Sequence, residues 1–123
     1  MNKKALISVL VLVFIGGVFV FTFNSNTQEP ENDSDRQVEL INCLAANSFV
    51  IYGTSTCPAC AQLVNSLGGY EVVAPIYVEC NEEQDRCAEN MQTNYVPEIQ
   101  INGEVYTGSR DPQVLAEQVG CKI

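Results

Sequence analysis

The chain contains no histidine, and few of its residues are positively charged. Six lysines and arginines stand against fifteen aspartates and glutamates, which gives the 123 residues a net charge of −9. Without histidine, no imidazolium can stabilise a thiolate, and a zinc site loses a common ligand. The acidic balance also argues against binding of nucleic acid and of anionic lipid.

Charge is also absent from residues 5–23, which follow Lys3 and Lys4. At the helical rise, this apolar run roughly spans a hydrocarbon core of about 30 Å. No small-x-small cleavage site ends it. We therefore expect a single-pass transmembrane anchor over residues 1–23, with the two lysines in the cytoplasm and the rest of the chain outside the cell membrane. A cleaved signal peptide is the main alternative.

The remainder divides into a linker and one small domain. Residues 24–35 are rich in Asn, Ser, Glu and Asp, which indicates a flexible acidic linker. Within residues 36–123, the hydrophobic periods and turn signals predict an α/β domain with a four-stranded mixed sheet flanked by helices. The first two strands should be parallel and the last two antiparallel. The expected helices cover 36–46, 61–67, 82–92 with Asn81 as cap, and a segment beginning at Pro112; the expected strands cover 49–52, 76–79, 98–101 and 104–107.

The motif Cys57-Pro58-Ala59-Cys60 lies between an expected strand and an expected helix. At a helix N-terminus, backbone N–H groups and the helix dipole stabilise the Cys57 thiolate, while Cys60, one turn on, is shielded. This combination of an attacking thiol and a resolving thiol predicts a redox-active disulfide as the catalytic site, with no other cofactor. A static disulfide, or half of a zinc site, is the weaker interpretation.

The other four cysteines also lie after the predicted anchor. An even number of cysteines in an exported domain indicates disulfides. Cys80 and Cys87 are close enough in the chain to be bridged, and Cys43 then pairs with Cys121 by default. We expect both bridges to be structural. The alternative is that Cys80 and Cys87 form a second redox pair that relays electrons.

These features resemble the thioredoxin-like superfamily. The likeness rests on the motif at 57–60, the Val96-Pro97 step before a hairpin, and Gly108 before the last helix. It is closest to the thioredoxin-like domains that are fused to, or work beside, bacterial and archaeal homologues of vitamin K epoxide reductase. It covers roughly residues 36 to 123 and includes these further pieces: Tyr52-Gly53, Gln62, Leu67-Gly68, Tyr77-Val78-Glu79-Cys80, Cys87, Ile101-Asn102-Gly103, Tyr106-Thr107-Gly108 and Gly120-Cys121.

The resemblance implies a thioredoxin-like fold in which a cis Pro97 faces the cysteine pair. A bound peptide would then pair with the exposed backbone of Val96, which makes Val96 and Pro97 candidate substrate-binding residues. The resemblance also implies two kinds of partner. A quinone-linked membrane oxidase related to vitamin K epoxide reductase would restore the disulfide, and exported cysteine-containing proteins would receive it.

Three positions depart from the family pattern. Thr56 stands where many relatives have tryptophan, and Ala59 where they often have histidine or tyrosine, so we expect a less oxidising disulfide than in the strongest oxidants of the family. Glu98 follows Pro97 where relatives usually have a small polar residue. Its charge would raise the pKa of Cys57 if it pointed at the active site, but we expect it to face solvent at the sheet edge.

The sequence therefore predicts a membrane-anchored, extracytoplasmic thiol–disulfide oxidoreductase. The direction of electron flow stays open, because a disulfide reductase or isomerase would use the same residues. A redox-inert adaptor that only binds peptides or a membrane partner is the alternative from a different functional class.

Overall fold

The computed structural model describes residues 32–122. The predicted anchor, and the predicted linker as far as residue 31, lie outside the described residues. From residue 32 to residue 122, none of the helices has the length and apolar character needed to cross a membrane.

Helix α2 (Asp33–Ala46) begins inside the segment predicted as a linker. The carbonyl of Asn32 accepts the N–H of Asp35 at 2.8 Å, which closes the first turn. Asp33 and Asp35 both lie in that turn, where the positive end of the helix dipole favours carboxylates. The acidic composition that indicated a linker therefore also suits a helix start.

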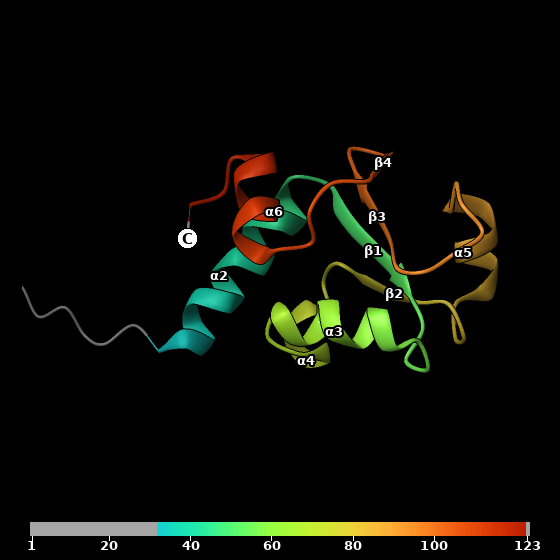
Figure 1. Cartoon of the computed structure of the whole chain (residues 1–123), viewed down its shortest axis with the longest axis horizontal. Helices are drawn as coiled ribbons and strands as arrows, with labels where there is room; N and C mark the ends of the chain where they lie inside the picture. The colour runs from blue at the N-terminus through green and yellow to red at the C-terminus, as the bar shows by residue number, and fades with distance from the viewer. Residues whose placement is uncertain (1–31, 123) are drawn as a thin grey trace, which may run out of the picture. The chain divides into compact units, whose positions relative to one another are not determined.

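The described residues form five helices and four strands (Figure 1). The strands make one sheet in the order β2-β1-β3-β4. β1 and β2 are parallel, and the other neighbouring pairs are antiparallel, so the predicted four-stranded mixed sheet is confirmed. In chain order the elements after α2 are β1 (Phe49–Gly53), α3 (Pro58–Ser66), α4 (Tyr70–Val73), β2 (Tyr77–Glu79), α5 (Gln84–Asn90), β3 (Glu98–Ile101), β4 (Glu104–Tyr106) and α6 (Pro112–Val119).

The two faces of the sheet carry hydrophobic cores of different size. Successive residues of a strand point to opposite faces, so Phe49 and Ile51 of β1 lie on one face and Tyr52 lies on the other. The first face belongs to a large core that α2, α3, α4 and α6 complete. The second face meets α5 in a small cluster of Tyr52, Val78 and Cys87. In Figure 1, α5 accordingly lies apart from the other helices.

Several elements have other bounds than predicted, and α3 begins at Pro58 and not at residue 61. Two further local features differ from the prediction. Residues 70–73, where no helix is predicted, form the single turn α4, because Gly69 turns the chain with a φ of 98° and its carbonyl accepts the N–H of Val73. Helix α5 begins at Gln84, and Asn81 does not cap it. The N–H groups of residues 82 and 83 bond to the carbonyl of Glu79 instead, which makes a turn at the end of β2.

The start of α6 follows the prediction. The Asp111 carboxylate accepts the N–H of Gln113 at 2.9 Å, and Pro112 occupies the first turn. A carboxylate cap followed by proline is a favoured helix start. Gly120 ends the helix in the left-handed region, with a φ of 77°. The capped start fixes the loop that carries Arg110.

Two disulfides join these elements, and both pairings are those expected from the sequence. Cys43–Cys121 links α2 to the segment after α6, across 78 residues. Cys80–Cys87 links the end of β2 to α5, across seven residues.

The two disulfides should stabilise the domain unequally, because a bridge that closes a longer loop removes more entropy from the unfolded chain. Replacing Cys43 and Cys121 by alanine should lower the free energy of unfolding by roughly 4–5 kcal/mol, and replacing Cys80 and Cys87 by roughly 2–3 kcal/mol. Urea unfolding of the two double variants measures both losses. A larger loss from the Cys80–Cys87 variant would show that the packing of α5, and not loop length, decides the contribution of that bridge.

Candidate redox site

Cys57 lies at the start of α3, just after the chain leaves β1. Its N–H donates to the Thr54 carbonyl at 3.1 Å, and Pro58 occupies the first helical position. Proline suits that position because its missing N–H would have no partner there. The Cys57 sulfur accepts the backbone N–H of Cys60 at 3.2 Å, as a capping side chain does. The predicted placement of Cys57 at a helix N-terminus is therefore confirmed.

The two thiols of the motif are free and lie in different surroundings. Cys57 is half-buried, whereas Cys60 is completely buried. The hydrogen bond from the Cys60 side chain holds the pKa of Cys57 below its usual value, and backbone N–H groups and the charge of Arg110 add to this. Burial, and the hydrogen bond that Cys60 donates to Cys57, raise the pKa of Cys60 to about 11. At neutral pH, Cys57 is therefore the better nucleophile and Cys60 stays protonated.

The Val96-Pro97 step lies opposite this motif. The carbonyl oxygen of Val96 is 3.8 Å from the Cys57 sulfur, although 39 residues separate the two in the chain. The Val96-Pro97 peptide bond is cis, and Pro97 is buried. β1 and β3 are antiparallel neighbours, so the turn that follows β1 and the loop that precedes β3 meet at the same end of the sheet.

Two hollows in the surface adjoin the site. The larger one, of about 310 Å³, lies between α5 and the loop before β3, and is lined by Cys87, Ala88, Met91, Thr93, Asn94 and Val96. The smaller one, of about 180 Å³, lies beside α3, and is lined by Ala59, Gln62, Leu63, Ser66 and Arg110. One hollow includes Val96 and the other includes Ala59 of the motif.

Arg110 is a site residue that the sequence reasoning missed. It lines the smaller hollow with Ala59, and its charge lowers the pKa of both thiols. The ion pair present among residues 32–122 joins Arg86 to Glu83, so Arg110 has no carboxylate partner in that range. The scarcity of positive residues in the sequence was the signal that could have drawn attention to it.

The expectation that Glu98 faces solvent at a sheet edge is wrong. β3 lies between β1 and β4, so it has no open edge, and Glu98 is only 3 % exposed. Burial alone would raise the pKa of its carboxyl group. Hydrogen bonds from Thr93, Gln92 and Gln100 outweigh that effect and hold the pKa below its usual value.

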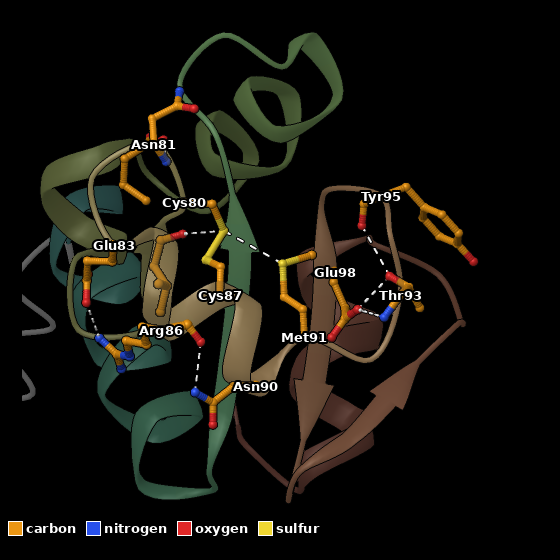
Figure 2. The surroundings of a disulfide bond; sticks show 12 residues. Cys80, Asn81, Glu83, Arg86, Cys87, Asn90, Met91, Thr93, Tyr95 and Glu98 are labelled. Carbon is orange, nitrogen blue, oxygen red and sulfur yellow. Dashed lines mark hydrogen bonds and ion pairs between the residues drawn. A yellow bond between two sulfur atoms is a disulfide. The ribbon is translucent and has the colours of Figure 1, made fainter.

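The second cysteine pair joins the end of β2 to α5. Cys80 and Cys87 are bonded to each other, and the Cys80 sulfur is 3.8 Å from the Met91 sulfur (Figure 2). In the part of the chain from residue 32 to residue 122, no three histidine, cysteine or acidic side chains are grouped so that they could hold a metal ion. This part of the chain therefore offers no ligand set for the zinc interpretation.

No protein-family model matches the chain, and no curated protein matches it in sequence. The resemblance to thioredoxin-like domains therefore stays a prediction. The geometry of the site supports the function proposed below.

Arg110→Ala should slow the alkylation of Cys57 by iodoacetamide at neutral pH, because losing the positive charge raises the pKa of Cys57 and lowers its thiolate fraction. An exposed charge acts weakly through water, so we expect a decrease of about two- to threefold. Alkylation rates measured against pH report the pKa. Arg86→Ala removes an equal charge from α5 and serves as the control. Equal decreases in both variants would mean that net charge matters and the position of Arg110 does not.

Proposed function

We propose that this protein is a thiol–disulfide oxidoreductase of thioredoxin-like fold, with Cys57 and Cys60 as its redox-active pair. One observation carries the proposal: an accessible thiol with a lowered pKa lies one helical turn before a buried thiol with a raised pKa. Thiol–disulfide exchange uses this asymmetry, because the accessible thiol forms the mixed disulfide with the substrate and the buried thiol then resolves it. A purely structural pair has no need of it. The mixed sheet and the proline loop beside Cys57 support the proposed fold.

In the oxidising direction, a substrate thiolate attacks the Cys57 sulfur of the Cys57–Cys60 disulfide. The bond between the two enzyme sulfurs breaks as a bond between the substrate and Cys57 forms, and Cys60 leaves and takes up a proton. A second substrate thiolate then attacks the substrate sulfur of this mixed disulfide, and Cys57 leaves. The substrate loses two electrons and two protons, and the enzyme gains them as two thiols.

The surroundings of Cys57 suit both steps. The N–H of Cys60 and the N-terminus of α3 stabilise the negative charge that the Cys57 sulfur carries when it leaves. An extended substrate segment would lie against the backbone of Val96, whose carbonyl oxygen is beside the Cys57 sulfur. A backbone contact of this kind holds the reacting sulfur without requiring a particular side chain in the substrate.

The proposed setting is the outer side of the cell membrane. The charge-free run at residues 5–23 would anchor the chain there, and two disulfides in the domain suit an oxidising compartment. Exported cysteine-containing proteins are the proposed substrates. A membrane oxidase related to vitamin K epoxide reductase would take the two electrons from the dithiol and pass them to a quinone.

A disulfide reductase or isomerase, which starts from the dithiol state and attacks a substrate disulfide, is favoured by one observation. A strong oxidant owes its strength to a strongly stabilised thiolate. Here the Cys57 thiolate is stabilised by hydrogen bonds from the side chain and the backbone of Cys60 and by the charge of the exposed Arg110. The chain has no histidine that could add to this.

The reduction potential of the Cys57–Cys60 pair separates these directions. We expect a value close to about −180 mV, above that of a reductase and below the roughly −120 mV of the strongest oxidants, because the thiolate is stabilised only in part. Equilibration of the full chain in glutathione buffers, followed by alkylation and mass measurement, gives the potential. A value near about −270 mV would instead support the reductase.

Cys60→Ala should trap a mixed disulfide between Cys57 and a peptide. The reduced variant would be mixed with two peptides joined by one disulfide. One peptide should then stay bonded to Cys57, because the resolving thiol is missing and the other peptide diffuses away. Mass spectrometry without reductant detects the adduct. Cys57→Ala is the matched control and should form none, since Cys60 is buried. If no adduct forms and the wild-type chain exchanges no disulfide, the enzyme proposal fails and the peptide-binding adaptor remains.

A further inference from the structure

Glu98 is a buried carboxylate whose partners are all uncharged. Its side chain lies on the face of the sheet that meets α5, opposite Tyr52 of β1, and is 3 % exposed. Among residues 32–122, no lysine or arginine pairs with it. Burying an unpaired charge costs free energy unless hydrogen bonds replace the lost water. Breaking one of those hydrogen bonds would therefore cost more free energy than breaking a hydrogen bond to a solvent-exposed group.

Four donors converge on this carboxylate. The backbone N–H of Gln92 lies 3.0 and 3.2 Å from its two oxygens, and the backbone N–H of Thr93 lies 2.7 Å from one of them. The Thr93 hydroxyl donates at 2.5 Å, and the Gln100 side-chain amide donates at 2.6 Å. Figure 2 shows Glu98 and Thr93 directed toward each other, with the loop to Tyr95 above them.

The same donors connect the carboxylate to two other parts of the domain. The Gln100 amide has a second N–H, which donates to the Asn90 carbonyl at the end of α5 at 2.8 Å. Gln92 and Thr93, whose N–H and hydroxyl groups donate to the carboxylate, belong to the loop before β3. Residues 91–97 have no helix or strand of their own, so these contacts hold the segment in place of regular backbone bonding. Val96, which faces Cys57, is in this segment.

We propose that Glu98 is a positioning residue for peptide substrates: it holds residues 92–96 so that the backbone of Val96 lies beside Cys57. This inference rests on the proposed function above. Glu98 is not a catalytic residue in this scheme, because its oxygens bond to the loop and not to the reacting sulfur. Its effect should appear where a substrate needs the Val96 backbone, and should be absent for a small disulfide that needs Cys57 alone.

Glu98→Gln tests the role of the carboxylate with almost no change in volume. The glutamine amide replaces an acceptor oxygen by an N–H₂ group. At one oxygen position this group would face the Gln92 N–H and the Gln100 amide, and at the other it would face the N–H groups of Gln92 and Thr93. Donors that face donors leave buried polar groups unpaired, so the loop should lose its fixed position. Glu104→Gln makes the same chemical change at an exposed site on β4 and is the matched control.

The experiment follows a single turnover, in which the reduced full chain is mixed with an excess of one of two disulfide substrates: two peptides joined by one disulfide, or a small aromatic disulfide. KM is then the substrate concentration that gives half the maximal single-turnover rate, and kcat is that maximal rate. For Glu98→Gln we expect the KM for the peptide substrate to rise about tenfold, as the loss of one charged hydrogen bond would give, with kcat changed less than about twofold. The rate with the small disulfide should stay within about twofold of the wild-type rate. Glu104→Gln should match the wild type with both substrates.

Three results would overturn the inference. The first is an unchanged KM for the peptide. The second is an equal loss with both substrates, which would mean that Glu98 supports the fold in general. The third is an equal effect of Glu104→Gln. If the wild-type chain itself exchanges neither disulfide, the proposed function fails, and this outcome is distinct from the others.

Thr93→Val covers the case in which Glu98→Gln does not fold. It removes only the hydroxyl bond and keeps the carboxylate and both backbone N–H bonds. We expect the same selective rise in the KM for the peptide, of about threefold, since one uncharged donor is lost. A variant that is folded by circular dichroism and shows no such rise would contradict the positioning role.

Discussion

The site depends above all on the residue at which α3 begins. Pro58 has no N–H and fits the first helical position, so Cys57 stands just outside the helix and Cys60 just inside it. That boundary exposes one sulfur and buries the other, and it directs the N–H of Cys60 at the Cys57 sulfur. The difference in pKa between the two thiols follows from the same placement. A single backbone boundary thus assigns different chemistry to two identical side chains.

The second component of the site is positioned from the opposite face of the sheet. Helix α3 is held by the large core, through Leu63 and Val64, whereas the loop that carries Val96 is held on the side of the small cluster under α5. Apolar packing holds the first component, and three hydrogen bonds from residues 92 and 93 join the second to the buried Glu98 carboxylate. The two meet because β1 and β3 are adjacent. The Cys57 thiol and the Val96 backbone are therefore held by different kinds of interaction.

Much of the architecture could be predicted from the sequence, because its signals are local. Apolar runs marked the strands, Asn102-Gly103 marked the hairpin, and the order of elements indicated the parallel first pair and the antiparallel last pair. The placement of Cys57 followed from the apolar run before the motif and the helical pattern beyond it. Asn81 failed as a cap because Glu79 accepts the N–H groups of the following turn.

Glu98 and Arg110 could not be placed from sequence for a different reason. A charged residue in a strand usually lies on an exposed face, and nothing in the residues next to Glu98 shows that Gln92, Thr93 and Gln100 will surround it. Arg110 directly precedes the Asp111 cap of α6, and it lines one hollow with Ala59 of the motif. Both roles depend on contacts between segments far apart in the chain, which a local pattern does not record.

The Cys43–Cys121 disulfide gives the domain a nearly circular covalent connectivity. The two bridged cysteines are 78 residues apart in the chain. The segment between them includes the Cys57–Cys60 motif, the Val96-Pro97 step and every strand of the sheet. A single cut by a protease in any loop of that circle opens the chain without dividing it into two molecules. The pieces stay together at high effective concentration, so their sheet and cores can hold. In the proposed extracytoplasmic setting, a cut in the backbone would therefore leave Cys57, Cys60 and Val96 in one covalently joined molecule.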